Sequence, residues 1–456
     1  MKMDLFTERM SETRTKVKRA EPVPVKHTTE HPASHGLVIE QDRLMEEMLE
    51  DENLQEALKR VIRNGGSPGV DGMTVKELPS YISNNRERIE ECLLSGTYEP
   101  KPVKRVEIPK PNGGVRKLGI PTVMDRYIQQ MVLQVLQAYI DPTFSESSFG
   151  FRPNRSAHQA IARAQEHIHA GHRWVVDMDL EKFFDRVNHD ILMGLLAKRI
   201  KDKRVLKLIR AFLNSGVMDV GLISLATEGT PQGGPLSPLL SNVVLDVLDK
   251  ELERRGHRFV RYADDCNIYV KSERAGDRVM ESITRFLEKK LKLKVNEQKS
   301  AVGTPSTRKF LGFSFTSGNH VKRRIASQAL KKFKARVRAI TKRSRGLKLE
   351  YIIFELNRYL RGWYGYFGFC ETPSVLVTLN GWIRHRLRSL LWKRWKTPRN
   401  RRRELRVRGV SGSHLKTSSS GKGPWRIGAT YALSRALPNS FFRTSGLYEL
   451  GVPKSK

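Results

Sequence analysis

The chain has 456 residues, a hydrophobic content of 39% and a formal net charge of +35. This length accommodates two or three domains with real cores. The charge makes a polyanion the expected partner, with a ribosome-like particle or a membrane surface as the alternatives. The sequence has no apolar run of transmembrane length, no signal-peptide pattern and no zinc-ligand spacing among its three cysteines. We therefore expect no membrane partner, no structural zinc and a cytoplasmic location.

The N-terminal third combines a polar leader with short helical and hairpin patterns. Residues 1–40 are mixed in charge and contain proline, which indicates a mobile leader. Residues 43–63 have the apolar spacing of a helix, which the glycine-rich run Gly65–Gly72 ends. That run is either an ordinary loop or a place where backbone approaches a nucleic-acid phosphate. Residues 103–120 alternate around Pro-Asn-Gly-Gly and predict a β-hairpin.

The hairpin carries two cations, Lys110 and Arg116. On facing strands they could hold a triphosphate, the lysine as a point charge and the arginine as a fork. A solvated hairpin edge is the simpler interpretation of these residues alone, because lysine is common on such edges.

Two arginines follow, Arg152 and Arg155, just before a helix predicted to open at Ser156. Cations near a helix N-terminus suit a nucleic-acid phosphate. The rings of Phe149 and Phe151 beside them either stack on a base or pack, and packing is the simpler interpretation.

Two apolar stretches carry carboxylates at their ends. Residues 173–180 predict a strand that reaches Asp179, and residues 259–270 predict a hairpin with Asp264 and Asp265 at its turn. An Asp-Asp turn alone is weak evidence, because aspartate is a common turn residue. Three carboxylates on two strands, however, can hold two Mg²⁺ ions about 4 Å apart, as in-line nucleotidyl transfer requires. One ion lowers the pKa of the attacking 3′-hydroxyl and the other neutralises the leaving pyrophosphate.

The order of the remaining elements indicates an α+β fold. Residues 239–252 and 278–293 have helical patterns, and residues 310–315 resemble a strand. Together with the two carboxylate-bearing stretches they give a βαβ unit followed by a β-hairpin, which indicates a ferredoxin-like arrangement.

Basic residues dominate the C-terminal third. Residues 322–345 hold eleven lysines and arginines and no acid, and residues 384–408 hold twelve against one glutamate. Like charges at helical spacing repel, so a bound polyanion explains them better than a solvated face. Between the blocks, residues 356–367 interleave aromatic rings with arginine and glycine. Some rings could stack on RNA bases, and at least half are expected to pack between helices.

Several of these segments carry a resemblance to a known family. Tyr262–Asp265 together with Asp179–Asp185 resembles the palm of a reverse transcriptase. Other segments, in the same order as in the family, narrow the resemblance to the group II intron reverse transcriptase/maturases: Ser67–Gly72, Ile108–Arg116, Phe149–Pro153, Gly229–Pro238 and Phe310–Phe313.

The resemblance implies an α+β right-hand polymerase. It places fingers and a ferredoxin-like palm over residues 41–325 and an α-helical thumb, called domain X, over residues 326–395. A basic linker and a small DNA-binding segment fill residues 396–456. The sequence has no paired cysteines, so the expected form lacks the HNH endonuclease domain and does not cleave the second DNA strand itself.

The resemblance also assigns roles to single residues. Asp179, Asp264 and Asp265 would be the catalytic metal ligands. Five residues would hold the incoming nucleotide, and Phe184 among them would exclude the 2′-hydroxyl: Lys110, Arg116, Phe184, Gln232 and Lys299. Ten residues would contact RNA: Arg152, Arg155, Lys331, Lys332, Arg336, Arg361, Trp363, Tyr364, Arg384 and Arg388.

The expected function is that of an RNA-directed DNA polymerase that binds its group II intron RNA, assists splicing and supports intron mobility. Its partners would be structured intron RNA, an RNA template with a DNA primer, deoxynucleotides and target DNA. The alternatives are a reverse transcriptase without an intron partner and a splicing factor that only binds RNA.

Replacing Phe184 by alanine should relax discrimination against ribonucleotides, because the ring that blocks the 2′-hydroxyl is removed. The measurement is the ratio of kcat/KM for deoxy- and ribonucleotides in wild type and Phe184→Ala. An unchanged ratio would remove Phe184 from the nucleotide site.

Overall fold

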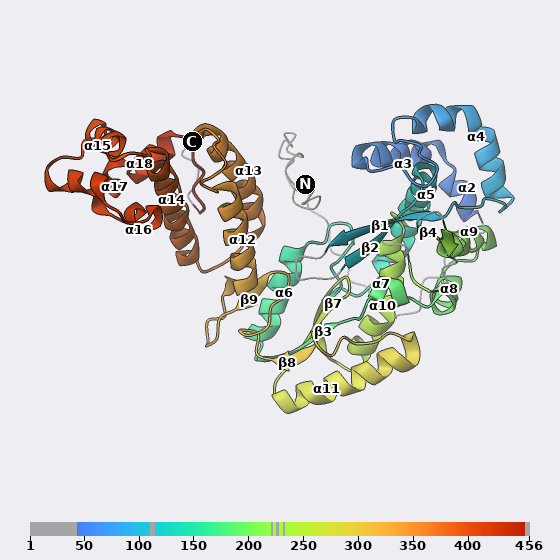
Figure 1. Cartoon of the computed structure of the whole chain (residues 1–456). Coiled ribbons are helices and arrows are strands. Elements are labelled where there is room, and N and C mark those ends of the chain that lie inside the picture. Colours follow the sequence, from blue (N-terminus) through green and yellow to red (C-terminus); the bar gives the residue numbers. More distant parts are fainter. Residues whose placement is uncertain (1–42, 110–114, 220–221, 225–227, 231–232, 452–456) are drawn as a thin grey trace, which may run out of the picture. The chain divides into compact units, whose positions relative to one another are not determined.

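The computed structural model describes residues 43–109, 115–219, 222–224, 228–230 and 233–451, and the predicted leader over residues 1–40 lies outside them. The described chain forms two compact units, one reaching to Arg308 and the other beginning at Lys309 (Figure 1). Each unit has a hydrophobic core of its own. The two units are described separately below.

A four-stranded sheet forms the centre of the first unit. Its strands lie in the order β6 (Arg258–Tyr262), β7 (Asp265–Val270), β3 (Trp174–Asp179) and β8 (Ala301–Gly303), with every neighbour antiparallel. Helices separate β3 from β6 and β7 from β8 along the chain. This order and connectivity are those of the ferredoxin-like βαββαβ arrangement, so the predicted α+β palm is confirmed.

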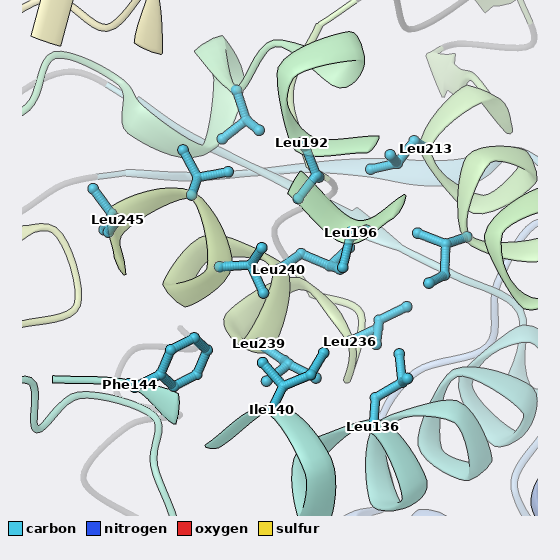
Figure 2. Close-up of a cluster of buried hydrophobic side chains, with 14 of the residues drawn as sticks. Leu136, Ile140, Phe144, Leu192, Leu196, Leu213, Leu236, Leu239, Leu240 and Leu245 are labelled. Carbon is cyan, nitrogen blue, oxygen red and sulfur yellow. The ribbon is translucent and has the colours of Figure 1, made fainter. Parts of the chain in front are cut away.

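Helices supply most of the core around this sheet. The helix α10 (Ser237–Arg254) is buried along most of its length, and α11 (Glu273–Phe286) packs on β3 and β7. Figure 2 shows leucines of α10 in one hydrophobic cluster with side chains of α5 (Val123–Ile140), α8 (His189–Ala197) and α9 (Lys203–Asn214). Interlocking leucines of this kind give the sheet a fixed support.

A second sheet follows from the predicted hairpin, whose strands are β1 (Val103–Pro109) and β2 (Val115–Ile120). The register pairs Lys104 with Ile120 and Pro109 with Val115. Two short strands extend the sheet in the order β2-β1-β4-β5, with β4 at Val217–Asp219 and β5 at Leu222–Ser224. The hairpin prediction is therefore confirmed.

The predicted helix over residues 43–63 is divided in two, α2 (Leu44–Met48) and α3 (Asp51–Asn64). The other elements of this unit are α4 (Leu78–Leu94), η1 (Asp141–Thr143), α6 (Ala157–His169), α7 (Phe183–Arg186) and η2 (Leu287–Leu291). The start of α6 was expected at about Ser156, and Ser156 is its N-cap with a full capping box.

The second unit is built on three long helices, α12 (Ser327–Ile340), α13 (Leu349–Phe367) and α14 (Ser374–Arg394). A short antiparallel pair, β9 (Phe313–Phe315) and β10 (Arg323–Ile325), precedes them. The ring of Phe313 contacts Phe367 with centroids 5.4 Å apart. The thumb was expected to begin at residue 326. This contact joins earlier residues to the helices, and the compact unit begins at Lys309.

The basic stretch after α14 was predicted as a linker, and this prediction is wrong for most of it. Residues 398–407 form the helix α15 (Pro398–Val407), capped by Thr397 and anchored by fully buried Leu405. The elements that follow share the core of α12–α14: η3 (Gly412–Ser419), α16 (Pro424–Gly428), α17 (Tyr431–Ala436) and α18 (Asn439–Thr444). No helix of the described residues is long and apolar enough to cross a membrane.

One buried ion pair connects several segments of the first unit. Arg261 of β6 and Asp249 of α10 are both fully buried, with Nε of the arginine 2.7 Å from Oδ1 of the aspartate. Although burial opposes the charge, the Asp249 carboxylate keeps the pKa of the Arg261 guanidinium raised. The remaining guanidinium donors reach Asn242 Oδ1, Ser148 Oγ and the carbonyl of Ala263.

Asp249→Ala should lower the free energy of unfolding by about 3–5 kcal/mol, because it leaves the Arg261 charge buried without its partner. Urea unfolding of the full chain measures the change. Glu281→Ala is the matched control, because its pair with Arg285 is exposed at 73% on both sides, and it should cost at most about 1 kcal/mol. An equal loss of unfolding free energy in both variants would contradict a stabilising role of the buried Asp249–Arg261 pair beyond that of an exposed ion pair.

Candidate active site

The strand register brings the three predicted carboxylates to one end of the palm sheet. Asp179 ends β3 and lies directly opposite Asp265, the first residue of β7. Asp265 also pairs with Tyr262 of β6, so Ala263 and Asp264 form a two-residue turn between these strands. Residues 85 positions apart in the sequence thus meet at one sheet edge, and all three aspartate side chains are half-buried.

The turn has a restrained backbone. Ala263 has a φ of +57°, a conformation that costs an L-residue about 1–2 kcal/mol. Its carbonyl accepts a 2.9 Å hydrogen bond from Arg261. A Cβ added to Gly150 would lie 2.2 Å from the Ala263 nitrogen, so only glycine allows this loop to approach the turn. The Gly150 carbonyl is itself held by Asn242 of α10.

Two cations lie beside the carboxylates. Lys299 Nζ is 3.1 Å from Asp179 Oδ1, and this lysine was predicted to belong to the site. Arg308 pairs with Asp177, two residues earlier on β3, at 2.7 Å. Arg308 also donates to the backbone carbonyl of Lys299, which fixes the segment that carries the lysine.

The donor set suits a divalent cation completed by substrate. Among the residues described, no group of three or more His, Cys, Asp and Glu side chains stands close enough to enclose a metal ion. Magnesium in phosphoryl-transfer sites is commonly held by one or two carboxylates together with substrate phosphates and water. The register pair Asp179 and Asp265 fits that mode, and the ammonium of Lys299 already lies where Asp179 attracts positive charge.

The structure describes only some of the residues that were predicted to bind the nucleotide. Lys110 and Gln232 lie outside the described residues. Arg116 is part of β2, with its Cα opposite that of Ile108. Phe184 is half-buried on α7 and meets Phe183 edge-on, with ring centroids 5.3 Å apart. Phe183 is 2% exposed and packs in the core of the first unit.

Gly233 and Gly234 allow their backbone to approach neighbouring segments closely. A Cβ on Gly233 would lie 2.4 Å from the Gly119 carbonyl oxygen of β2, and one on Gly234 would meet Gln129. At Gly229 an added Cβ would lie 2.8 Å from the carbonyl oxygen of Phe184. Gly229 therefore lies against the palm at Phe184, and Gly233 lies against the strand that carries Arg116.

Burial contradicts two of the predicted RNA contacts. The Arg152 side chain is 3% exposed, pairs with Asp141 at 3.0 Å and donates to three backbone carbonyls. The Trp363 ring is packed between Phe333 and Phe367, with centroids 4.3 and 4.9 Å away. Both residues hold the fold together, because their polar or aromatic surfaces are already covered by the protein.

Other predicted RNA contacts are engaged within the protein but remain partly accessible. Arg155 pairs with Glu146, Arg384 pairs with Glu449 at 2.9 Å, and Arg388 donates to the Leu437 carbonyl. Burial, followed by the nearby Arg384 charge, lowers the pKa of Arg388. The half-buried Tyr364 ring meets Tyr448 at 6.3 Å. The exposed members of the set are Lys331, Lys332, Arg336 and Arg361.

Sequence reasoning missed the residues that support the turn. These residues are buried: Arg261 donates to the turn at Ala263, Asn242 donates to the neighbouring loop at Gly150, and Asp249 holds Arg261. The seven-residue spacing of Asn242 and Asp249 on one helix face was the available signal. Phe149 packs as expected, whereas Phe151 is 47% exposed with a φ of +59°.

Two parts of the chain match known families. Residues 108–315 match the family described as reverse transcriptase (RNA-dependent DNA polymerase). Residues 330–409 match the group II intron, maturase-specific domain. The two matches follow one another in the order that the sequence motifs predicted.

Relatives agree with these matches. Protein YkfC of Escherichia coli (strain K12) is 34% identical, over 57% of this chain and 79% of its own length. Group II intron-encoded protein LtrA of Lactococcus lactis subsp. cremoris is 30% identical, over 59% of this chain and 56% of its own. The putative COX1/OXI3 intron 1 protein of Saccharomyces cerevisiae is 28% identical, over 52% of this chain and 29% of its own length. With both domains matched, the chain belongs to the group II intron reverse transcriptase/maturase family.

Proposed function

We propose that this chain is an RNA-directed DNA polymerase that copies its group II intron RNA, assists the splicing of that RNA and supports intron mobility by target-primed reverse transcription. The observation that carries the polymerase proposal is the register of β3 and β7, which sets Asp179 opposite Asp265 with Asp264 in the adjoining turn. Family membership supports the RNA partner.

The proposed chemistry needs carboxylates at a fixed place. Asp179 and Asp264 would be the principal ligands of two Mg²⁺ ions, with Asp265 supporting them. When bound, such ions activate a 3′-hydroxyl and neutralise a leaving pyrophosphate. The chain's own task is to orient the primer end and the nucleotide. Phe184 would lie against the sugar, Lys110, Arg116 and Gln232 would hold the triphosphate, and Lys299 would meet the departing pyrophosphate.

RNA binding is proposed to rest mainly on the second unit. Residues 309–456 hold 34 lysines and arginines against five glutamates and no aspartate, a net charge of +29. The exposed cations of α12, which include Lys331, Lys332 and Arg336, lie on a helix with a buried apolar side. Cations on a folded helix neutralise RNA phosphates without the entropy cost of ordering a disordered tail.

Replacing Asp264 and Asp265 by alanine together should reduce DNA synthesis at least about 1000-fold, because the metal-dependent stabilisation of the transition state is lost. Splicing of the intron RNA should persist, since the RNA performs that chemistry. Primer extension and splicing are measured on the same preparations.

The matched control is Asp277→Ala, which removes an exposed carboxylate of α11 away from the turn and should leave both activities unchanged. Wild-type protein without DNA synthesis would make the chain an RNA-binding splicing factor only. Sequencing of copurified RNA tests the partner. Enrichment of one structured RNA whose gene also encodes this chain supports the intron assignment, and bulk RNA would indicate a reverse transcriptase without an intron partner.

Lys299→Ala should lower the Mg²⁺ concentration for half-maximal synthesis by about 1.5- to 5-fold, because it removes a cation that competes for Asp179 in an exposed ion pair. It should also slow turnover if the lysine meets the pyrophosphate. A magnesium titration of primer extension measures both effects. Lys294→Ala, at an exposed lysine of the same segment, should change neither. A raised magnesium requirement in Lys299→Ala would contradict the competition.

A further inference from the structure

A basic cleft with a volume of about 560 Å³ lies in the second unit, whereas the three carboxylates described above belong to the first unit. This volume is within the range of pockets that hold small organic ligands. A loop after α12 and the segment leading into α16 supply its lining: Arg343, Gly421, Lys422, Gly423, Pro424, Trp425 and Arg426.

One aromatic ring is fixed at this cleft. Trp425 is 41% exposed, and its ring stacks on the imidazole of His385 with centroids 3.8 Å apart and an interplanar angle of 18°. A ring nitrogen of His385 lies 2.7 Å from the Trp425 carbonyl oxygen. A Cβ at Gly428 would lie 2.6 Å from the His385 ring, so a glycine is required for α14 and α16 to approach this closely. The indole is therefore held in place before any ligand arrives.

Three cations line the same cleft as Trp425. Arg343, Lys422 and Arg426 are exposed, and none forms an ion pair within the described part of the chain. Gly421 and Gly423 flank the lysine, and a Cβ at either would meet nothing within 4 Å. The backbone on both sides of the lysine is therefore uncrowded, and the lysine is exposed and lines the same cleft as the tryptophan.

The positive charge continues beyond the cleft. Burial lowers the pKa of Arg386, and the charges of Arg338 and of the cleft residue Arg343 lower it further. The ring of Trp382 lies under three cations at 5.4 to 5.9 Å, namely Lys334, Arg338 and Arg386. Trp382, His385 and Arg386 share α14, so cations and rings alternate along one side of that helix.

We propose that this cleft binds an unpaired nucleotide of a single-stranded nucleic acid, with the base stacked on Trp425 and the flanking phosphates held by Arg343, Lys422 and Arg426. The proposal rests on the proposed function, because it assumes that the chain works on nucleic acid. Fixed aromatic rings between cations are the usual means of binding single strands without reading sequence.

A duplex does not fit this chemistry equally well. The faces of paired bases are covered by their neighbours, so a ring such as Trp425 can stack only on a base that is free of the helix. The phosphates of a duplex would still meet Arg343, Lys422 and Arg426. Single strands should therefore depend on the ring and the cations, and duplexes on the cations alone.

The test is binding of fluorescent ten-nucleotide oligouridine, oligothymidine and a DNA duplex to the full chain. Trp425→Ala should weaken single-strand binding about 10-fold or more and leave the duplex unchanged. Trp425→Phe should restore most of the loss. Lys422→Ala should lower the dependence of log affinity on log salt by about 0.7 for single strands. If Trp425→Ala weakens binding of only one of the two single strands, the cleft binds that nucleic acid. If it weakens binding of both, the cleft recognises base and phosphate without distinguishing RNA from DNA.

Tyr431→Ala is the matched control, because this ring is 60% exposed on α17 and is not part of the cleft. Quenching of tryptophan fluorescence by oligouridine, present in wild type and absent in Trp425→Phe, is a second readout that does not need the alanine variant. Unchanged single-strand binding in Trp425→Ala, or an equal loss for duplex and single strands, would overturn the proposal. Primer extension on a preformed template–primer, measured in parallel, reports on the polymerase separately.

Discussion

The burial of the Arg261 guanidinium against the Asp249 carboxylate is the interaction on which the palm depends. Two charges without solvent contact are costly, and they are tolerated only where every donor finds an acceptor. Here the five donors of Arg261 reach Asp249, Asn242, Ser148 and the Ala263 carbonyl. One side chain thereby joins α10, β6, the loop before α6 and the turn that carries Asp264.

This connection explains how the two half-buried carboxylates of the turn, Asp264 and Asp265, keep their place. The Asp-Asp turn contains an alanine at positive φ and is approached closely by Gly150. An unsupported turn of this kind would relax, because nothing in its own sequence prefers that backbone. A rigid frame beneath it keeps the carboxylates where a charged substrate can meet them, which is a general requirement of preorganised sites. The pairs of Asp179 with Lys299 and of Asp177 with Arg308 balance the negative charge of the same edge.

The second unit carries its charge differently. Its cations are attached to helices with a shared apolar core, which reaches from Phe333 on α12 to Leu450 near the end of the described chain. The folded core decides which aromatic rings are available. Trp363 and Trp392 are enclosed, whereas Trp425 and Tyr431 remain exposed. Aromatic residues interleaved with arginine in the sequence thus divide into packing and surface groups only when the helices assemble.

The sequence by itself determined the family, the order of the palm strands and helices, the hairpin of the fingers and the segments that carry Asp179, Asp264 and Asp265. These depend on local periodicity, turn chemistry and the order of motifs, all of which can be read along the chain. Only the tertiary structure decided that Asp179 lies opposite Asp265, that Arg152 and Trp363 are buried, that the basic stretch after α14 is a helix, and that Asp249 supports the turn through Arg261. The physical reason is that burial and pairing depend on contacts between residues far apart in the chain, and the identity of a residue does not disclose which distant partner will cover it.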